Sequence, residues 1–402
     1  MQTKLADQYK NSPEGREADD ILRSCVHCGF CTATCPTYQL LGDELDGPRG
    51  RIYLMKQLLE GGPVTHKTQT HLDRCLTCRA CETTCPSGVR YGRLVDIGRG
   101  IVEQRVERTI ADRVMRKALR TIVPNRTLFS SLLGVGQMVK PLLPADLKTK
   151  VPAWQRPQPW PQNTHSRKML VLEGCVQPVT APNTNAAAAR VLDKLGIQLL
   201  RAGNAGCCGA LSHHLSAHEE GLDHMRRNID VWWPYVEQGI EAIVMTASGC
   251  GVVVKDYGKL LEHDAAYADK AEKISSLTKD LGEVLVNENT ASLGEPAKTQ
   301  KVAFHSPCTL QHGQRITGSV EKILTAAGYR LTDVTDPHLC CGSAGTYSIL
   351  QPALSQQLLQ NKLESLQVES PDVIATANIG CQLHLATKAD VSVKHWIELL
   401  DY

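Results

Sequence analysis

Long apolar segments and an excess of one charge sign are both missing from this 402-residue chain. No run of about 18 apolar residues occurs, so nothing in the sequence is predicted to span a bilayer. Residues 1–20 are polar and charged and do not resemble a secretory signal peptide. Lys and Arg total 44 and Asp and Glu total 42, which leaves no net field to attract nucleic acid. We therefore expect a cytoplasmic protein with no transmembrane segment and no nucleic-acid partner.

Nucleotide-binding motifs are also missing. The sequence has no G-x-G-x-x-G at the head of a strand-helix unit and no G-x-x-x-x-G-K-[ST], so neither a dinucleotide site nor a triphosphate site is indicated. Cysteine, by contrast, is abundant, with 16 residues. In a long chain without a secretion signal, these cysteines are more simply interpreted as reduced metal ligands than as disulfides.

Eight of the cysteines form two copies of one spacing. The segments 25–36 and 75–86 both read C-x₂-C-x₂-C-x₃-C-P, the spacing by which bacterial-type ferredoxins bind [4Fe-4S] clusters. In such pairs the first three thiolates of a run bind one cluster, and the fourth binds the other cluster. The predicted ligands are Cys25, Cys28, Cys31 and Cys85 for cluster 1, and Cys75, Cys78, Cys81 and Cys35 for cluster 2.

Zinc is the alternative metal for these eight thiols. Zinc sites need four ligands in total, usually from two separated pairs or from a mixture of Cys and His. Here four cysteines fall within eleven residues, twice, and a proline follows each run. The spacing therefore favours two coupled iron-sulfur clusters and an electron-transfer function.

Helical periodicity connects and follows the two runs. Apolar residues recur at helical spacing over 48–60, which Gly61-Gly62-Pro63 should end. A second helical pattern covers 101–123, and its opposite face is basic: Arg105, Arg108, Arg113, Arg116, Lys117 and Arg120. Such a face is either simply solvated or a docking surface for an acidic partner or phospholipid headgroups. Arg49 and Arg51 could offset the negative charge of the clusters or could merely begin a solvated helix.

The remaining eight cysteines belong to a second, longer repeat. Each unit has one cysteine after a strand-like segment, a second strand-like segment followed by a Cys-Cys-Gly triplet, and a last cysteine after a third strand-like segment. The second strand-like segments are 197–200 and 329–332. The first cysteine precedes the pair by 32 residues in both units, and the last follows the pair by 42 residues in one and 40 in the other. The predicted metal ligands are Cys175, Cys207, Cys208 and Cys250 in the first unit, and Cys308, Cys340, Cys341 and Cys381 in the second.

The order of these elements predicts the domain organisation. Strands and helices alternate in both units, which favours two related α/β units with small parallel sheets and with the cysteines at strand-to-loop junctions. Six prolines between Pro141 and Pro161 indicate a semi-rigid linker before them. We therefore predict a helix-rich ferredoxin-like domain with two [4Fe-4S] clusters, followed by two repeated α/β cysteine-rich units. The expected boundaries are 1–140 for the ferredoxin domain, 141–168 for the linker, and 169–290 and 300–402 for the two units.

With both repeats in place, the chain resembles the iron-sulfur subunits of glycolate oxidase (glycolate dehydrogenase), which combine a ferredoxin domain with two cysteine-rich CCG domains. The segments 33–51 and 339–346 carry this resemblance most closely. The same architecture occurs in anaerobic glycerol-3-phosphate dehydrogenase, lactate-utilisation proteins and heterodisulfide reductases. In the last of these the motif ends C-x-x-C, and five thiolates hold an unusual cluster. Val253 and His384 stand where that fifth cysteine would be, so disulfide-cleaving chemistry is not expected here.

Histidines near the CCG cysteines admit two interpretations. Four thiolates per unit could hold a further iron-sulfur cluster or a zinc ion, and His384 could add a ligand in the second unit. The other histidines are more simply expected to orient ligands through hydrogen bonds. They are His213, His214, His305 and His312.

The resemblance implies a function shared between chains. Oxidation of a 2-hydroxy acid needs an organic cofactor, which this sequence has no motif to bind, so no catalytic residue is expected here. The expected role is the electron-transfer subunit of a glycolate oxidase complex, in which FAD on a partner subunit oxidises glycolate to glyoxylate. Electrons would continue to an acceptor such as a membrane quinone, from a peripheral position on the cytoplasmic face of the inner membrane. The alternatives are the same role in lactate or glycerol-3-phosphate oxidation, and CCG units that act as a zinc-stapled docking scaffold.

Overall fold

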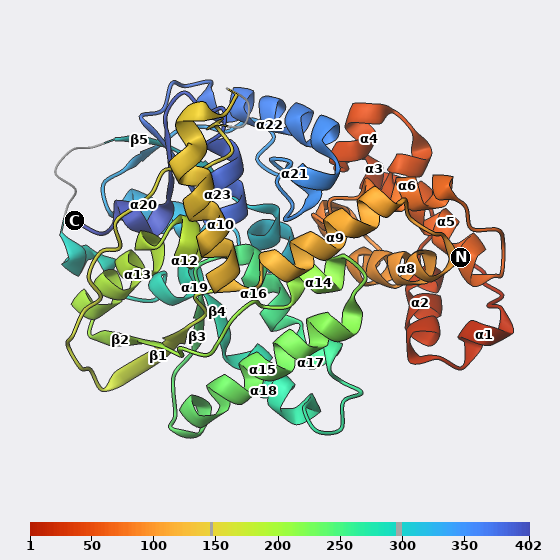
Figure 1. Cartoon of the computed structure of the whole chain (residues 1–402), viewed down its shortest axis with the longest axis horizontal. Helices are drawn as coiled ribbons and strands as arrows, with labels where there is room; N and C mark the ends of the chain where they lie inside the picture. Colours follow the sequence, from red (N-terminus) through yellow and green to blue (C-terminus); the bar gives the residue numbers. More distant parts are fainter. Residues whose placement is uncertain (145–147, 295–299) are drawn as a thin grey trace.

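The computed structural model describes residues 1–144, 148–294 and 300–402. A helical part occupies one end of the molecule, on the right of Figure 1, and two α/β parts make up the remainder. This arrangement confirms the predicted order of a helix-rich region followed by two repeated α/β units.

Short helices build the first part around one apolar core. The predicted helix over 48–60 is confirmed as α5, which has Pro48 in its first turn, where the missing amide hydrogen costs nothing. Leu22, Met55 and Leu94 come from three different helices and are fully buried together. The elements are α1 (Asp7–Lys10), α2 (Pro13–Ser24), α3 (Phe30–Ala33), α4 (Pro36–Leu41), η1 (Glu44–Asp46), α5 (Pro48–Leu59), α6 (His66–Asp73), α7 (Ala80–Thr84) and α8 (Tyr91–Arg105).

The continuous helix predicted over 101–123 is wrong. Helix α8 ends at Arg105, and a new helix, α9 (Ile110–Ile122), begins after Thr109, whose hydroxyl caps its first turn. Between them the backbone is extended at Val106, because this side chain is buried in the core of the helical part. The apolar periodicity therefore belongs to two helices in different surroundings.

The basic residues of this segment are not simply solvated. Arg108 and Arg116 both contact Asp73, with nitrogen to oxygen distances of 2.7 and 3.4 Å. Arg120 contacts Glu220 in the first α/β part at 3.0 Å. Part of the predicted basic face is thus used for contacts within the chain.

Helices α9 and α10 (Arg126–Val139) extend from the helical part across the α/β parts (Figure 1). Arg126 contacts Glu173 at 3.2 Å, and the short helix η2 (Lys140–Leu142) follows. The proline-rich segment then has no regular secondary structure over 152–165, and residues 145–147 of the predicted linker lie outside the described residues.

Two four-stranded parallel sheets organise the α/β parts. Their strand orders are β2-β1-β3-β4 and β6-β5-β7-β8, so the two units have one topology. The sequence repeat predicted three strands in each unit, but β4 and β8 were missed. The strands are β1 (Arg167–Val171), β2 (Ile197–Arg201), β3 (Ile243–Met245) and β4 (Thr278–Asp280), then β5 (Lys301–His305), β6 (Arg330–Leu331), β7 (Val373–Thr376) and β8 (Ser392–His395).

Helices follow the strands in the order that a parallel sheet requires. In the first unit they are α12 (Gln177–Thr180), α13 (Asn183–Lys194), α14 (Ala210–His214), α15 (His218–Glu237), α16 (Ser248–Lys255), α17 (Tyr257–Leu260), α18 (Ala268–Leu277), α19 (Leu281–Leu285) and η3 (Thr290–Leu293). In the second they are η4 (Thr309–Gly313), α20 (Ser319–Ala326), α21 (Tyr347–Leu350), α22 (Pro352–Gln367), α23 (Ile379–Leu385) and η5 (Trp396–Leu399).

The two α/β units share a hydrophobic core. One continuous cluster contains Leu192 and Leu281 from the first unit and Val320 and Trp396 from the second, all essentially inaccessible to solvent. Burial of apolar surface of this kind is the main favourable contribution to packing. The cysteine-bearing loops therefore project from one packed body.

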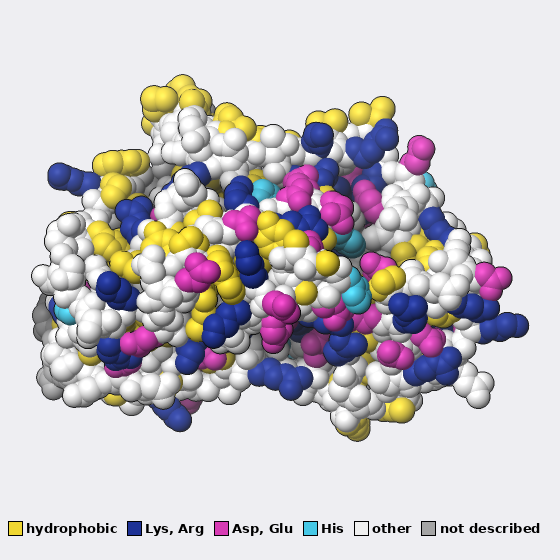
Figure 2. Space-filling model, turned by 90° about the horizontal axis from the view of Figure 1, so that it is seen from below, with side chains coloured by type: hydrophobic (Ala, Val, Ile, Leu, Met, Phe, Trp, Pro, Cys, Tyr) yellow, Lys and Arg dark blue, Asp and Glu magenta, His cyan; other side chains and the backbone are white. Residues whose placement is uncertain are grey.

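The face of the molecule in Figure 2 carries charges of both signs. Acidic and basic side chains are intermingled on the face shown in Figure 2, while hydrophobic side chains project at its upper edge. No helix within residues 1–144, 148–294 or 300–402 combines the length and the apolar composition needed to cross a membrane.

Candidate metal centres

The two ferredoxin-type runs have one local backbone geometry. His27 and Gly29 in the first run have positive φ values of 55° and 88°, and Thr77 and Arg79 in the second have 54° and 60°. Left-handed residues between successive cysteines curl the chain, so that each loop wraps around a common centre. The repeat in sequence is therefore a repeat in conformation.

The thiols assigned to cluster 1 meet at one cavity. Cys25, Cys28, Cys31 and Cys85 all line it, together with Cys81 from the other run. Burial and, to a smaller extent, the nearby Cys25, Cys28 and Cys85 together raise the pKa of the Cys31 thiol to about 11. The fourth cysteine of the second run thus faces the first three of the first run, and the crossed ligand assignment remains a prediction.

The thiols assigned to cluster 2 are more deeply placed. Cys35, Cys75 and Cys81 are buried, and Cys78 is partly buried. Burial raises the pKa of Cys81 well above its usual range, with further contributions from Cys78, Cys75 and Cys35. This arrangement again combines three cysteines of one run with the last cysteine of the other.

The spacing of these sulfur atoms suits clusters better than single ions. Two sulfur atoms on one zinc ion, each about 2.3 Å from it, lie no more than about 4.6 Å apart. Among the described residues, no three of the ferredoxin-type cysteines have sulfur atoms within 4.8 Å of one another. Thiolates of an iron-sulfur cluster stand further apart, because each binds a different iron. The donor sets therefore fit [4Fe-4S] clusters.

A buried arginine lies beside cluster 2. Arg51 has 1% of its surface exposed and donates hydrogen bonds to the Thr37 hydroxyl at 3.2 Å and to the His71 carbonyl at 2.7 Å. Its guanidinium also faces the carboxylate of Asp46 at 3.4 Å. The Thr37 hydroxyl lies 3.4 Å from the Cys35 sulfur. Of the two interpretations of Arg51, the solvated helix start is therefore wrong.

Arg49 differs from Arg51. It pairs with Glu44 at 2.6 Å on the outside of the helical part, and its side chain is 38% exposed. Cys31 is among the groups that raise the pKa of Arg49. The charge of Arg49 therefore lies near the cysteines assigned to cluster 1 but is screened by solvent.

The first CCG unit brings its four cysteines together. Cys175 follows β1, Cys207 and Cys208 precede α14, and Cys250 lies in α16. Cys175 and Cys208 lower the pKa of Cys207 well below its ordinary value, and Cys207 in turn raises their pKa values. These mutual shifts arise because the three thiols lie next to one another.

Polar side chains fix the loop that carries the Cys207-Cys208 pair. The Asn228 amide donates to the Cys207 carbonyl at 2.9 Å, and the Tyr257 hydroxyl donates to the Cys208 carbonyl at 2.8 Å. Gly209 follows with φ of 90°, which an L side chain rarely adopts. The glycine of the Cys-Cys-Gly triplet is thus required by the turn itself.

The second CCG unit places its cysteines in the same way, but all four are buried. The Cys308 thiol donates to the Cys340 sulfur at 3.8 Å, and Asn378 donates to the Cys381 sulfur at 3.5 Å. Burial contributes to raised pKa values for Cys308, Cys340 and Cys341.

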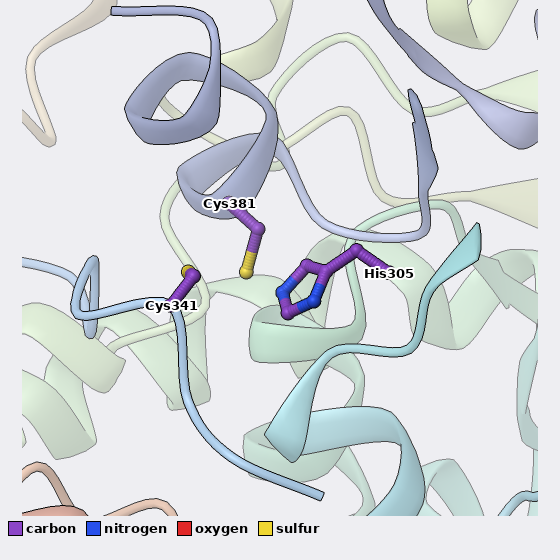
Figure 3. A group of neighbouring side chains, drawn as sticks. All are labelled: His305, Cys341 and Cys381. Carbon is purple, nitrogen blue, oxygen red and sulfur yellow. The ribbon is translucent and has the colours of Figure 1, made fainter. Parts of the chain in front are cut away.

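One histidine joins the second site. A ring nitrogen of His305 and the sulfur atoms of Cys341 and Cys381 lie within 4.8 Å of one another. Figure 3 shows the imidazole extending from β5 toward the Cys381 sulfur. Sequence reasoning assigned His305 only an orienting role, although its place three residues before Cys308 was visible.

Three other histidines near the cysteines, His384, His312 and His214, have hydrogen-bond partners in the protein. The His384 imidazole is hydrogen-bonded to the Ser355 hydroxyl at 3.1 Å and lies outside the three-donor group. His312 contacts the Thr83 hydroxyl of α7 at 2.9 Å, and His214 contacts the Asp96 carboxylate of α8 at 3.2 Å. His312 and His214 therefore connect the CCG units to the helical part.

Cluster 2 and the second CCG site are neighbours. Cys78 packs in the same buried group as Cys308 and Cys340. Burial, followed by the charge of Cys308, raises the pKa of Cys78. The Tyr347 hydroxyl of the second unit donates to the Arg74 carbonyl at 3.1 Å, which fixes the two parts together beside this contact. This long-range contact could not be seen in the sequence.

Known proteins share both cysteine patterns. A 4Fe-4S dicluster domain family matches residues 21–89, and a cysteine-rich domain family matches 169–255 and 302–386. The chain is 57% identical over 402 residues to the glycolate oxidase iron-sulfur subunit of Escherichia coli (strain K12), covering 100% of this chain and 98% of that protein. It is 29% identical over 409 residues to the probable glycolate oxidase iron-sulfur subunit of Bacillus subtilis (strain 168), covering 94% and 91%.

More distant similarities cover the fold. Lactate utilization protein A of Bacillus subtilis (strain 168) is 24% identical over 241 residues, which are 58% of this chain and 99% of that protein. Among solved structures, a hypothetical protein from Helicobacter pylori superposes with a TM-score of 0.56 at 10% identity, covering 98% of this chain and 72% of that one.

The fold and the cysteine repeats define an iron-sulfur protein of the class that combines a dicluster domain with two CCG units. Within that class, the chain belongs to the family of glycolate oxidase iron-sulfur subunits. The resemblance inferred from the sequence is thereby confirmed.

Proposed function

We propose that this chain is the electron-transfer subunit of a glycolate-oxidising complex. The observation that carries the proposal is that Cys85 of the second run lines one cavity with Cys25, Cys28 and Cys31 of the first, in a chain 57% identical to a glycolate oxidase iron-sulfur subunit. When bound, the clusters supply one-electron transfer. The cysteines of α3 and α7 and of the segments on either side of each helix would hold them, and the two sets adjoin within one packed core.

Oxidation of glycolate to glyoxylate takes place on a partner subunit in this proposal. The reaction needs an organic cofactor such as FAD, and the sequence has no nucleotide-binding motif. The partner is therefore a flavoprotein, and this chain receives its electrons and passes them to an acceptor such as a membrane quinone.

The second CCG site is the proposed next redox site. Cys78 of cluster 2 lies against Cys308 and Cys340, so no intervening element separates the two cysteine sets. The zinc-stapled scaffold is the alternative for the CCG units, and metal analysis of the purified chain distinguishes iron from zinc there.

The experiment that tests the function compares the chain alone with the complex. The chain purified anaerobically with its clusters should accept electrons from dithionite but should not reduce a dye with glycolate. Addition of the flavoprotein partner should restore glycolate-dependent reduction of the clusters. Glycolate-dependent dye reduction by the chain alone would contradict the proposal that glycolate is oxidised on a partner subunit.

The exposed helices α9 and α10 are the proposed contact with the membrane surface. Ile110, Val114 and Met138 are 73%, 62% and 74% exposed, although apolar side chains of this size are normally buried. Arg113 and Lys117 are exposed beside them on α9, which suits anionic lipid headgroups. The double variant Val114→Glu, Met138→Glu should lose sedimentation with anionic vesicles, and unchanged sedimentation would contradict this placement.

The same role in lactate oxidation is the second candidate. Lactate utilization protein A matches the chain at 24% identity over 58% of its length. Lactate offered to the reconstituted complex tests it, and the proposal for glycolate requires glycolate to be the better reductant.

A further inference from the structure

The second CCG site contains a buried imidazole without a hydrogen-bond partner. His305 stands at the end of β5 with 2% of its surface exposed. Neither of its ring nitrogens has a hydrogen-bond partner among the described residues. A buried polar group without a partner destabilises a folded protein, so such groups usually serve a ligand or a reaction.

The orientation of this imidazole points to a metal. A ring nitrogen lies within 4.8 Å of both the Cys341 and the Cys381 sulfur atoms, and the two sulfur atoms are equally close to each other. Figure 3 shows the ring and the Cys381 side chain approaching from β5 and α23, with Cys341 on a third segment. Nitrogen and sulfur atoms on one ion, at about 2.1 and 2.3 Å from it, require spacings of this size.

The first CCG unit lacks this donor. Leu172 stands three residues before Cys175, as His305 stands three residues before Cys308, and it is buried with 3% of its surface exposed. The two units have one topology, so the difference lies in the donor set and not in the fold.

A buried lysine side chain also lies beside the second site. Lys362 is 2% exposed, donates to the Asp336 carbonyl at 2.9 Å, and lies close enough to Cys340 and Cys341 to interact electrostatically with both. A buried cation beside thiols favours their ionised form, which is the form that binds metal.

We propose that His305 is a metal ligand of the second CCG site, binding zinc or iron through one ring nitrogen together with the thiolates of Cys341 and Cys381. Imidazole and thiolate together are donors that both metals accept. The inference rests on the proposed metal role of the CCG cysteines and adds a mixed nitrogen and sulfur site that the first unit does not have. Binding releases the thiol protons of the two cysteines.

The test counts metal in the anaerobically purified full chain. His305→Leu, which copies the first unit, should lose the metal of the second CCG site while the spectra of the two ferredoxin-type clusters stay unchanged. His305→Cys should retain that metal, because a thiolate replaces the imidazole. His384→Leu is the matched control, since it removes a buried histidine of the same unit whose ring is already bonded to Ser355.

Spectroscopy identifies the ligand directly. If the metal is zinc, X-ray absorption at the zinc edge should show a nitrogen neighbour that disappears in His305→Cys. If it is iron, a ¹⁴N coupling of the paramagnetic site should disappear in that variant. Both results support the inference.

Two outcomes distinguish a failure of this inference from a failure of the proposal that the CCG cysteines bind metal. If Cys341→Ala loses metal but His305→Leu keeps the wild-type metal content and spectra, His305 is not a ligand and the inference is overturned. If Cys341→Ala also keeps all its metal, the CCG cysteines themselves are not ligands, and both statements fail.

Discussion

Removal of the Arg51 charge should lower the reduction potential of cluster 2. The guanidinium is buried and bonded to Thr37, and the Thr37 hydroxyl in turn contacts the Cys35 sulfur. The charges of Cys35 and Cys75 both act on Arg51. A fixed cation stabilises the reduced cluster, which carries one more negative charge, and its loss should make reduction less favourable.

The size of the effect follows from two contacts. The distances of 3.4 Å from the Cys35 sulfur to the Thr37 hydroxyl and 3.2 Å from that hydroxyl to Arg51 place the guanidinium nitrogen within about 6.6 Å of the sulfur. At this distance and an effective dielectric constant of about 20, one unit charge contributes about 2.5 kcal/mol. For a one-electron couple this corresponds to roughly 110 mV.

The assay is a redox titration followed by electron paramagnetic resonance on the anaerobically purified chain. Arg51→Gln should lower the potential of cluster 2 by roughly 110 mV. Arg51→Lys keeps the charge and should remain close to the wild type, which separates charge from folding. Arg49→Gln is the second control, because Arg49 is 38% exposed beside cluster 1 and its charge is screened by solvent.

Two results would refute this reasoning. One is a cluster 2 potential in Arg51→Gln that matches the wild type while both clusters are intact. The other is an equal shift in Arg51→Lys, which would show that geometry rather than charge sets the potential.

Three further predictions concern the cysteine sites and their packing. Cys85→Ser should damage cluster 1 and spare cluster 2, and spectroscopic loss of cluster 2 alone would show that the ligands are not crossed. Gly342→Ala should disrupt the second CCG site, because the backbone there has a φ of 87° and a Cβ would stand 2.6 Å from the Ser355 carbonyl oxygen. Gly209→Ala should disrupt the first CCG site instead. Loss of the same metal in both variants would contradict these assignments. Burial lowers the pKa of His395 to about 4, below about 6.5 in the unfolded chain. The unfolded state therefore binds more protons, and stability should fall by about 1 kcal/mol as the pH drops from 7 to 5.5. His395→Gln should remove that part of the pH dependence in thermal unfolding, and an unchanged dependence would exclude His395 as its source.

Local patterns in the sequence predicted much of this protein. Cysteine spacing identified the two ferredoxin-type loops, because a ligand set within eleven residues depends on local turns rather than on distant packing. Periodicity and flanking glycine or proline predicted the helix over 48–60 and three strands of each α/β unit, because these signals also depend on neighbouring residues. The family resemblance rested on these same segments.

Other features depended on contacts between distant segments. Strands β4 and β8 lie at the edges of their sheets and are polar, with the sequences Thr-Lys-Asp and Ser-Val-Lys-His, so they are recognisable only by their pairing with β3 and β7. The burial of Val106, which ends α8, and the burial of Arg51 follow from how the helices pack, since periodicity alone does not say which side faces the core.

The sequence by itself determined which cysteines form repeats, and the tertiary structure decided which repeats adjoin. Cys78 and Cys308 are far apart in the chain, and only the docking of the second CCG unit on the helical part brings them together. His305 likewise becomes a candidate ligand only when β5 and α23 place it beside Cys341 and Cys381. Spacing along a chain specifies local geometry, whereas contacts between remote segments arise from the burial of surfaces that the sequence does not pair in advance.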